Sequence, residues 1–243
     1  MNPLVIVADA HLTREDPEVD VFLAFLEKVA IHAGTLAVLG DLFNIWFGEP
    51  RFALPHHEKV LAAFERLARS DVRILYIEGN RDFHLRRTLL GRPFQAVTED
   101  HLVETIGGWR VWMTHGDEIN LEDRPYRMWK AFSKSTIVYG VFSNLPGAWG
   151  TSLGERLERE LAGTNIRHKS RFPEDHCLAY ARRVFEQGCH ALVLGHFHEE
   201  REIPCGERDG HRLGVYVVPA WRDAHRYLTF EGDAPPRFVT FEG

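Results

Sequence analysis

Residues 4–11 read LVIVADAH, and this stretch decides the fold class. The apolar run from Leu4 to Ala8 predicts a buried β-strand, and a carboxylate and an imidazole, those of Asp9 and His11, follow it directly. Open α/β sheets collect their functional side chains at the carboxyl ends of the strands. The stretch therefore predicts an α/β sheet whose first strand delivers two potential metal ligands at its end.

The same pattern, an apolar run followed by polar residues, recurs four more times. Runs at 36–39, 72–77, 110–114 and 191–194 end in Gly40-Asp41, Gly79-Asn80-Arg81-Asp82, His115-Gly116-Asp117 and Gly195-His196-Phe197-His198. The glycines allow the chain to turn sharply after the strands. Because these strands end at one edge of the fold, we expect the five motifs to share one crevice.

The motifs supply enough ligands for a pair of divalent metal ions. The candidates are two carboxylates, four imidazoles and one amide oxygen, with no thiolate, which suits manganese, iron or zinc. Seven ligands exceed the needs of one ion, so we expect two ions about 3.5 to 4 Å apart that activate a water and polarise a phosphoryl group. We assign one ion to Asp9, His11 and His198 and the other to Asn80, His115 and His196, with Asp41 bridging both.

Taken singly, each motif has a simpler interpretation, because aspartate and histidine are common in surface loops. The series of five makes that interpretation improbable for the motifs together. The ten remaining histidines, including the adjacent His56 and His57, lie outside the motifs. We expect them to be surface or capping residues.

The order of the motifs resembles that of the calcineurin-like metallophosphoesterase family, from Asp9 to His198, about four-fifths of the chain. The resemblance implies a single domain, residues 1–243, built as a four-layer αββα sandwich. A helical cap is expected as an insertion at 122–171. Between the strands, helices are expected at 19–32, 57–70 and 175–187, and strands at 213–218, 226–230 and 237–241 are expected to close the second sheet antiparallel.

Within the family the chain is most similar to the pyrophosphatases of the lipid A pathway. The finer resemblance lies in Leu12 after His11, Leu42-Phe43 after Asp41 with Trp46 nearby, and Phe83 after Asp82. It implies attack on the α-phosphorus of UDP-2,3-diacylglucosamine, which releases UMP and 2,3-diacylglucosamine 1-phosphate. The substrate contacts that it implies are Asn80, Arg81, Asp123, Tyr126, Asn165 and Lys169. Departures at 163–169, Phe197, Glu199 and Arg222 leave recognition of the UDP moiety open.

Arg81 carries separate chemical information, because many family members have a histidine at its position. An arginine stays charged near neutral pH and cannot act as an acid. This suits a leaving group that needs no proton, such as a phosphate monoester with a second pKa of about 6. We expect Arg81 and His196 to stabilise charge on the phosphoryl group and Asp82 to orient a neighbour such as Arg81.

The expected insertion is rich in aromatic and aliphatic residues, among them Tyr126, Trp129 and Phe132. One interpretation is a helical pair that packs its aromatic face on the core. The other is a cap in which Trp129 and Phe132 contact acyl chains, because insertions at the mouth of a site often determine specificity. The cationic residues that follow would meet the diphosphate or the anionic surface of the inner membrane, or form a solvated helix face.

Composition limits the partners. A net charge of −6 argues against nonspecific binding of nucleic acid. Three cysteines without a paired spacing fit a reducing cytosol, and the apolar run that stops at Asp9 is too short for a signal peptide. We therefore expect a cytoplasmic protein that touches the inner membrane peripherally, with an amphiphilic UDP-sugar lipid as substrate and no obligate protein partner.

Two alternatives remain open. A related hydrolase could act on a water-soluble nucleotide or phosphodiester, and it would share the metals but would not need an apolar cap. A scaffold protein on the same fold would have lost its metals, which the full set of ligands disfavours. A lipid-binding measurement distinguishes the lipid hydrolase from the hydrolase of a water-soluble substrate. Metal analysis of the purified protein distinguishes either enzyme from the scaffold protein.

Overall fold

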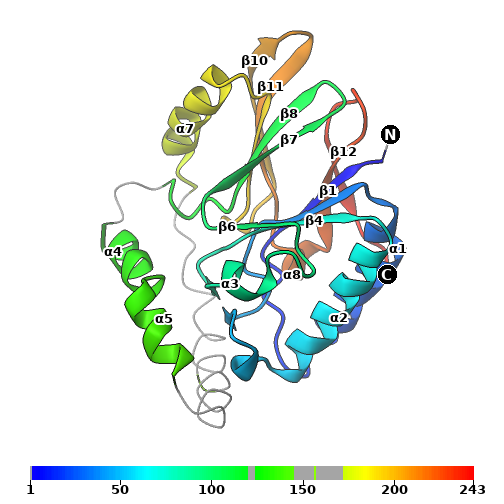
Figure 1. Cartoon of the computed structure of the whole chain (residues 1–243). Helices are drawn as coiled ribbons and strands as arrows, with labels where there is room; N and C mark the ends of the chain where they lie inside the picture. The colour runs from blue at the N-terminus through cyan, green and yellow to red at the C-terminus, as the bar shows by residue number, and fades with distance from the viewer. Residues whose placement is uncertain (1, 120–123, 145–155, 157–171) are drawn as a thin grey trace.

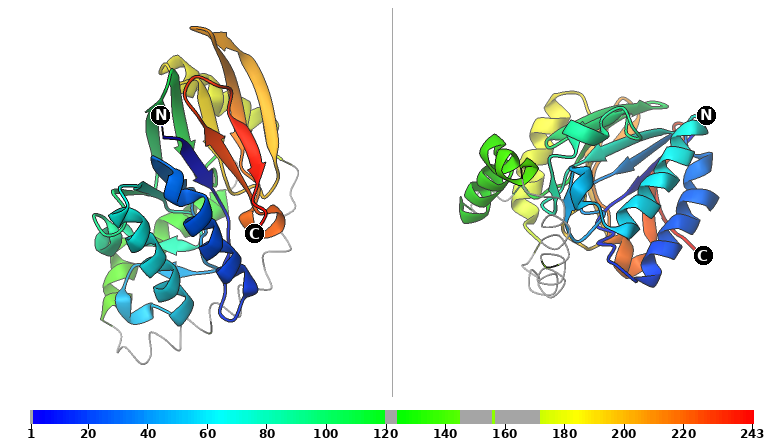
Figure 2. Two further views of the ribbon diagram at one scale, coloured as in Figure 1. Left: turned by 90° about the vertical axis from the view of Figure 1, so that its right-hand side faces the viewer. Right: turned by 60° about the horizontal axis from the view of Figure 1, so that its bottom comes forward.

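The computed structural model describes residues 2–119, 124–144, 156 and 172–243, and it describes 124–127, 129 and 142 by their backbone only. Two sheets face each other, with helices on both outer sides (Figures 1 and 2). The predicted α/β class and the four-layer sandwich are confirmed. Among the described helices, none is long and apolar enough to cross a membrane.

The first sheet has six strands in the order β13-β12-β1-β2-β4-β6. Strands β1, β2, β4 and β6 run parallel, whereas β12 is antiparallel to β1 and β13 is antiparallel to β12. Their bounds are Leu4–Val7 for β1, Thr35–Val38 for β2, Arg73–Ile77 for β4, Ala96–Thr98 for β6, Arg226–Phe230 for β12 and Arg237–Thr240 for β13.

The second sheet has five strands in the order β10-β11-β9-β8-β7. Strand β9 is parallel to both of its neighbours, and the outer strands β7 and β10 are antiparallel to theirs. The bounds are His101–Ile106 for β7, Trp109–Thr114 for β8, Ala191–Leu194 for β9, Arg201–Arg208 for β10 and His211–Val217 for β11. A small parallel pair, β3 (Trp46–Phe47) with β5 (Asp82–Phe83), lies beside the sheets.

Helices α1 (Pro17–Lys28) and α2 (Pro55–Arg69) cover the first sheet, and α7 (Glu174–Glu186) covers the second (Figure 2). Short helices complete this body: η1 (Ala30–His32), η2 (Pro50–Phe52), α3 (Arg86–Leu89) and α8 (Trp221–Ala224). Two further helices, α4 (Arg124–Ser133) and α5 (Thr136–Ser143), stand beside it (Figure 1). Asp16 begins α1 as its N-cap, because its side chain accepts a hydrogen bond from the Glu18 amide, and Pro17 follows at the first helical position.

Alternation along β1 shows how the layers are held together. Val5 and Val7 point to the cluster beneath α1 and α2, while Leu4 and Ile6 point to the cluster between the sheets. A third cluster lies between the second sheet and α7 and includes Phe185. Because each layer buries an apolar face against the next, the strand ends are fixed relative to one another.

The prediction that three late strands close the second sheet antiparallel is wrong. Strand β11 joins that sheet parallel to β9, and β12 and β13 extend the first sheet. The register pairs Leu4 with Phe230 and Ile6 with Leu228, so the apolar residues of β12 face the cluster between the sheets. The alternation of apolar and polar residues predicts which face of each strand is buried, but it does not predict which strands pair with each other.

Phe25 on α1 offers a test of the first helical layer. It is fully buried, and its ring contacts those of Trp221, Tyr227 and Phe241. We expect Phe25→Ala to lower the free energy of unfolding by about 3 to 5 kcal/mol in urea titrations, as for other large-to-small core substitutions. Leu90→Ala, at a side chain that is 47% exposed, serves as control and should change it by no more than about 0.5 kcal/mol. Equal effects of the two substitutions would argue against this packing.

Candidate metal centre

Each of the two candidate carboxylates is anchored through one oxygen and presents the other to the site. The Asp9 Oδ2 atom accepts a hydrogen bond of 2.7 Å from the His196 amide, and Asp41 Oδ1 accepts one of 2.8 Å from the Arg81 amide. These bonds tie β1 to the loop after β9, and the loop after β2 to that after β4. The remaining oxygens, Asp9 Oδ1 and Asp41 Oδ2, face the imidazoles.

A first group of donor atoms gathers around the end of β1. The Nε2 atoms of His11 and His198 lie 3.2 Å apart, and Asp9 Oδ1 lies 3.9 Å and 3.6 Å from them, respectively. Asp41 Oδ2 lies 3.9 Å from His11 Nε2. Bonds to a divalent ion of about 2.0 to 2.2 Å would let these atoms share one ion.

A second group gathers around Asn80. Its Oδ1 atom lies 3.2 Å from both His115 Nε2 and His196 Nδ1. Asp41 Oδ2 lies 3.9 Å from His115 Nε2 and therefore stands between the two groups. The structure brings all seven expected ligands close together, with Asp41 Oδ2 between the two groups.

The chemistry of the donors fits divalent metal. Asp9 Oδ1 is buried and accepts no hydrogen bond from the described residues, and burial without a partner is costly for a carboxylate oxygen. Asp9, His11 and His198 form one set that could hold an ion, and Asp9, Asp41 and His115 form another. A cation would satisfy these converging oxygens and ring nitrogens at once.

His115 is held so that it can bind an ion through a defined nitrogen. The His115 Nδ1–H group donates to the Leu39 carbonyl at 2.6 Å, which leaves Nε2 free to bind an ion. Burial, and then the neighbouring His115, lower the pKa of His196 to about 4, so its ring is neutral. Burial works to lower the pKa of His198, but the Asp9 carboxylate raises it to about 8.

The backbone at the site adopts an uncommon conformation. Five candidate ligands have left-handed φ angles: Asp9 (53°), His11 (44°), Asp41 (52°), His196 (67°) and His198 (57°). Such residues cost about 1 to 3 kcal/mol each and persist where the surroundings dictate them. Gly40 also has a positive φ, of 82°, whereas a Cβ atom at Gly79 would lie 2.2 Å from Asp41 Oδ1. Close approach, and not a sharp turn, thus requires glycine at position 79.

Asp82 has partners other than the Arg81 side chain that we expected it to orient. Its buried Oδ2 accepts hydrogen bonds from the amides of Asp41 (2.9 Å) and Gly79 (2.8 Å) and from the Tyr76 hydroxyl (3.0 Å). Burial, and then the charge of Asp41, raise its pKa to about 7. Asp82 therefore holds together the two loops that carry Asp41 and Asn80.

Arg222 is a positioning residue that the sequence did not reveal as one. Its Nη1 atom donates to the His11 carbonyl at 3.0 Å and to Asp16 Oδ2 at 2.6 Å. It thereby braces the first ligand loop against the start of α1. The only signal was its departure from the subfamily pattern, and that departure does not say what the residue contacts.

Several expected substrate contacts fall outside the described residues or side chains. Asp123, Asn165 and Lys169 are among the residues not described, and Tyr126 and Trp129 are described by their backbone in α4. Phe132 is described, and 60% of it is exposed. The interpretation in which the aromatic face of the insertion packs on the core is therefore wrong for Phe132.

The expectation that the histidines outside the motifs are surface or capping residues is wrong for His56, His84 and His190, which are buried. The rings of His56 and His57 pack against Phe43, and burial lowers the pKa of His57 well below its usual value, so that the His57 ring is neutral. His57 also has a capping role, because its Nδ1 atom accepts a hydrogen bond from the Leu54 amide at the start of α2.

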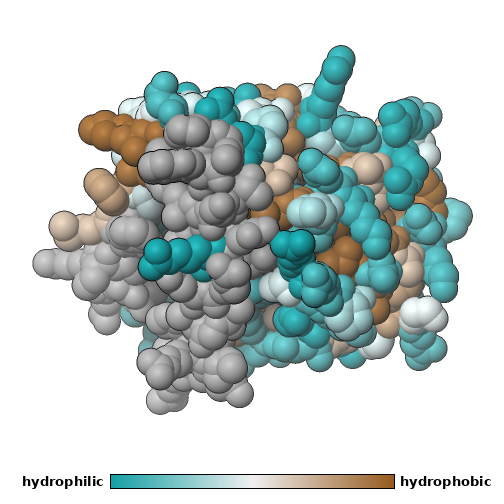
Figure 3. Space-filling model, turned by 90° about the horizontal axis from the view of Figure 1, so that it is seen from below, coloured by the Kyte–Doolittle hydropathy of each residue, from teal (hydrophilic) through white to brown (hydrophobic). Residues whose placement is uncertain are grey.

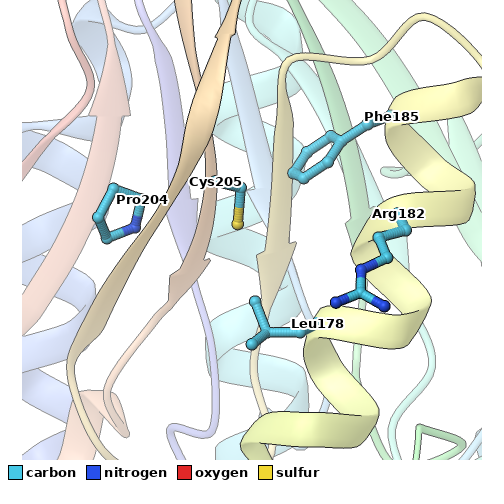
Figure 4. A pocket seen from close by; sticks show the side chains of 5 residues that line it. All are labelled: Leu178, Arg182, Phe185, Pro204 and Cys205. Atoms are coloured by element: carbon cyan, nitrogen blue, oxygen red, sulfur yellow. The ribbon is translucent and has the colours of Figure 1, made fainter.

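A separate pocket lies between α7 and β10 (Figure 4). Its cavity volume is about 200 Å³, and Leu178, Arg182, Phe185, Pro204 and Cys205 line it. It is lined by none of the seven candidate ligands, and it lies at the outer face of the second sheet. We therefore assign it no part in the metal chemistry.

Gly79 gives a test of the site geometry. Because an added Cβ would overlap Asp41 Oδ1, we expect Gly79→Ala to displace the carboxylate and reduce the bound metal, measured by elemental analysis after loading, to half of the wild-type amount or less. Gly140→Ala is the control, because a Cβ there meets nothing within 4 Å and alanine favours the helix. Full metal content in Gly79→Ala would show that the loops do not approach as closely as the structure has them.

Comparisons with known proteins agree with this geometry. No protein-family model matches the chain. The chain is 27% identical to UDP-2,3-diacylglucosamine hydrolase of Serratia proteamaculans, over 96% of this chain and 97% of the relative, and 26% identical to the hydrolase of that name from Chromohalobacter salexigens, over 98% and 96%. An archaeal phosphodiesterase of known structure shares the fold, with a TM-score of 0.50 and 13% identity over 98% of this chain and 99% of that one. The chain is thus similar along nearly its whole length to UDP-2,3-diacylglucosamine hydrolases, the group that its motifs indicated.

Proposed function

We propose that the chain is a two-metal hydrolase that cleaves the pyrophosphate bond of UDP-2,3-diacylglucosamine and releases UMP and 2,3-diacylglucosamine 1-phosphate. The observation that carries this proposal is the pair of donor groups that share Asp41. The similarity to hydrolases named for this substrate, over nearly the whole chain, supports the choice of substrate.

The proposed metal set follows the two groups of donor atoms. Asp9, His11 and His198 hold one ion, Asn80, His115 and His196 hold the other, and Asp41 bridges them. We propose manganese, because oxygen and imidazole donors without thiolates suit it, with iron and zinc as the other fitting ions. When bound, the ions supply a water of lowered pKa and polarise the phosphoryl oxygens.

Arg81 is proposed to stabilise the charge that develops on the phosphoryl group. A guanidinium can donate two parallel hydrogen bonds to phosphoryl oxygens. The Arg81 amide already fixes Asp41 Oδ1, so the arginine is built into the loop that orients the bridging carboxylate. His196 assists at the same group. The leaving phosphate needs no proton, which agrees with an arginine at this position.

The polar end of the substrate is proposed to meet Asn80 and Arg81 directly. Asp123, Tyr126, Asn165 and Lys169 are proposed as further contacts, on the resemblance alone. They belong to the segment 122–171, which we treat as a cap inserted into a single domain. Trp129 and Phe132 of the cap are proposed to contact the acyl chains.

The helix pair α4–α5 supports a lipid ligand, because four of its described apolar side chains are exposed. Met128 is 74% exposed, Phe132 60%, Ile137 76% and Val141 60%. Hydrophobic side chains gather at the edge of the molecule beside this pair (Figure 3). We call these four residues the lipid face. Exposed apolar clusters commonly mark contact sites, and we propose that this face enters the surface of the inner membrane, where the amphiphilic substrate resides.

The test of the proposed reaction is identification of the products. With manganese added, wild-type protein should release UMP from UDP-2,3-diacylglucosamine at least tenfold faster than from an unacylated UDP-sugar or a generic phosphodiester, as followed by chromatography. Asp41→Ala is the matched negative control, and it should lose nearly all activity and at least one ion, because one carboxylate oxygen serves both groups. Faster hydrolysis of a water-soluble substrate would favour the alternative hydrolase, and a wild-type protein that binds no metal would favour the scaffold.

The lipid face has its own test. Burial of a large apolar side chain contributes about 1.5 to 3 kcal/mol, so Phe132→Asp combined with Ile137→Asp should weaken binding to phospholipid vesicles at least tenfold in flotation assays. Hydrolysis of a generic phosphodiester should stay within about twofold, because both residues are largely exposed. The control is Leu90→Asp, at an exposed apolar residue outside the helix pair. Unchanged flotation of the double variant would contradict the membrane contact.

A further inference from the structure

Among the side chains that the structure describes, the helix pair contacts the core through polar groups and exposes apolar ones. Lys130 and Lys134 stand one helical turn apart along the chain, and both are buried where they enter the protein, with side chains 9% and 5% exposed. An ordinary surface helix buries its apolar residues and exposes its lysines. The described side chains of this pair show the reverse arrangement.

Lys134 reaches the residue that precedes the Asn80 motif. Its Nζ atom lies 3.3 Å from Oε2 of Glu78, which is completely buried. The other oxygen of Glu78 accepts a hydrogen bond from the Arg86 amide, and the Glu78 amide donates to the Thr98 carbonyl at 2.7 Å. Glu78 is thus held firmly at the end of β4, directly before Gly79 and Asn80, and Lys134 fixes the helix pair to that point.

Lys130 reaches the motif that carries His115. Its Nζ atom lies 2.9 Å from Asp117 Oδ2 and 2.9 Å from Glu118 Oε1. Burial works to lower the pKa of Lys130, but the Asp117 carboxylate raises it above its usual value, so the lysine is charged. Asp117 is buried and stands two residues after the candidate ligand His115. The two lysines therefore attach α4 and the residue just after it to two different ligand loops.

Helix α5 adds a third polar contact. The Tyr139 hydroxyl donates a hydrogen bond to Glu49, and the Arg87 guanidinium lies 4.1 Å from the centre of the Tyr139 ring. Polar contacts of this kind are directional, whereas apolar surfaces can slide over one another. Buried charges in particular define one position, because a shifted lysine would leave a carboxylate unpaired.

We propose that Lys130 and Lys134 are positioning residues that fix the lipid face at a set distance and angle from the metal centre. This inference rests on the proposed function, since it concerns how an amphiphile is presented to that centre. A substrate with acyl chains on the lipid face reaches the ligand loops only if the helix pair is held in place. A small phosphodiester, which does not touch the helix pair, needs no such contact.

The experiment uses the full chain and the pair Lys134–Glu78. Lys134→Met alone leaves a buried carboxylate without its partner and could unfold the protein. The main variant is therefore Lys134→Met with Glu78→Gln, whose side-chain oxygen can still accept from Arg86. Lys134→Arg keeps the charge and serves as the rescue. Lys59→Met, which breaks an exposed ion pair with Asp20 on the far helices, is the matched control.

We expect the double variant to raise KM for UDP-2,3-diacylglucosamine about tenfold while kcat changes by less than about twofold, the pattern for lost substrate binding. Turnover of a generic phosphodiester and the metal content should match those of wild type. Hydrogen exchange of the α4 amides, measured on metal-free protein, should accelerate about tenfold, because local opening becomes easier. Lys134→Arg should restore KM to within about threefold of wild type, and Lys59→Met should change none of these measurements.

Equal losses on both substrates would overturn the proposal, since the pair would then support the metal loops themselves. Unchanged KM together with unchanged exchange would overturn it as well. If wild-type protein binds metal but does not hydrolyse the diacylated substrate, the proposed function fails independently. In that case the exchange of α4 still decides whether the lysines hold the helix pair.

Discussion

The position of the Asp41 carboxylate is the constraint on which the rest of the site depends. One of its oxygens is fixed by the Arg81 amide, and its own amide is fixed by Asp82. The other oxygen therefore faces His11 and His115 equally, at 3.9 Å from each. Both donor groups share this atom, so a displacement of Asp41 disturbs both of them.

The two sheets make this position possible. Apolar layers on both faces of the first sheet hold the ends of β1, β2 and β4 side by side, and the cluster between the sheets places the ends of β8 and β9 opposite them. The left-handed residues after these strands then turn their side chains toward a common centre. The packing energy of the sandwich outweighs the strain of these few residues.

Much of this arrangement could be predicted from the chain itself. Five apolar runs, each followed by ligand-type residues, predicted the strands, and the residue types predicted the grouping around Asp41. The role of Asp82 could not be predicted, because its contacts with the Asp41 and Gly79 amides exist only after three segments have come together. The placement of β12 and β13 could not be predicted for a related reason. Alternation of apolar and polar residues shows which face of a strand is apolar, but not which sheet edge the strand joins.

The helix pair α4–α5 shows a different limit of prediction from the sequence. Its composition indicated an apolar surface, yet the direction in which that surface points depends on where Lys130 and Lys134 find carboxylates. Those carboxylates stand within or directly beside the ligand motifs, so the parts of the molecule proposed to recognise lipid and to bind metal are joined by ion pairs. The proposed enzyme thus links its two tasks, holding an amphiphile and hydrolysing it, through contacts about one helical turn apart.

The most direct measurement of the central claim is anomalous diffraction from crystals of the protein loaded with manganese. The account predicts two peaks, about 3.5 to 4 Å apart as in other two-metal sites. One peak should lie among Asp9, His11 and His198, the other among Asn80, His115 and His196, and Asp41 Oδ2 should bind both. A single peak, or two peaks that do not share Asp41, would contradict it.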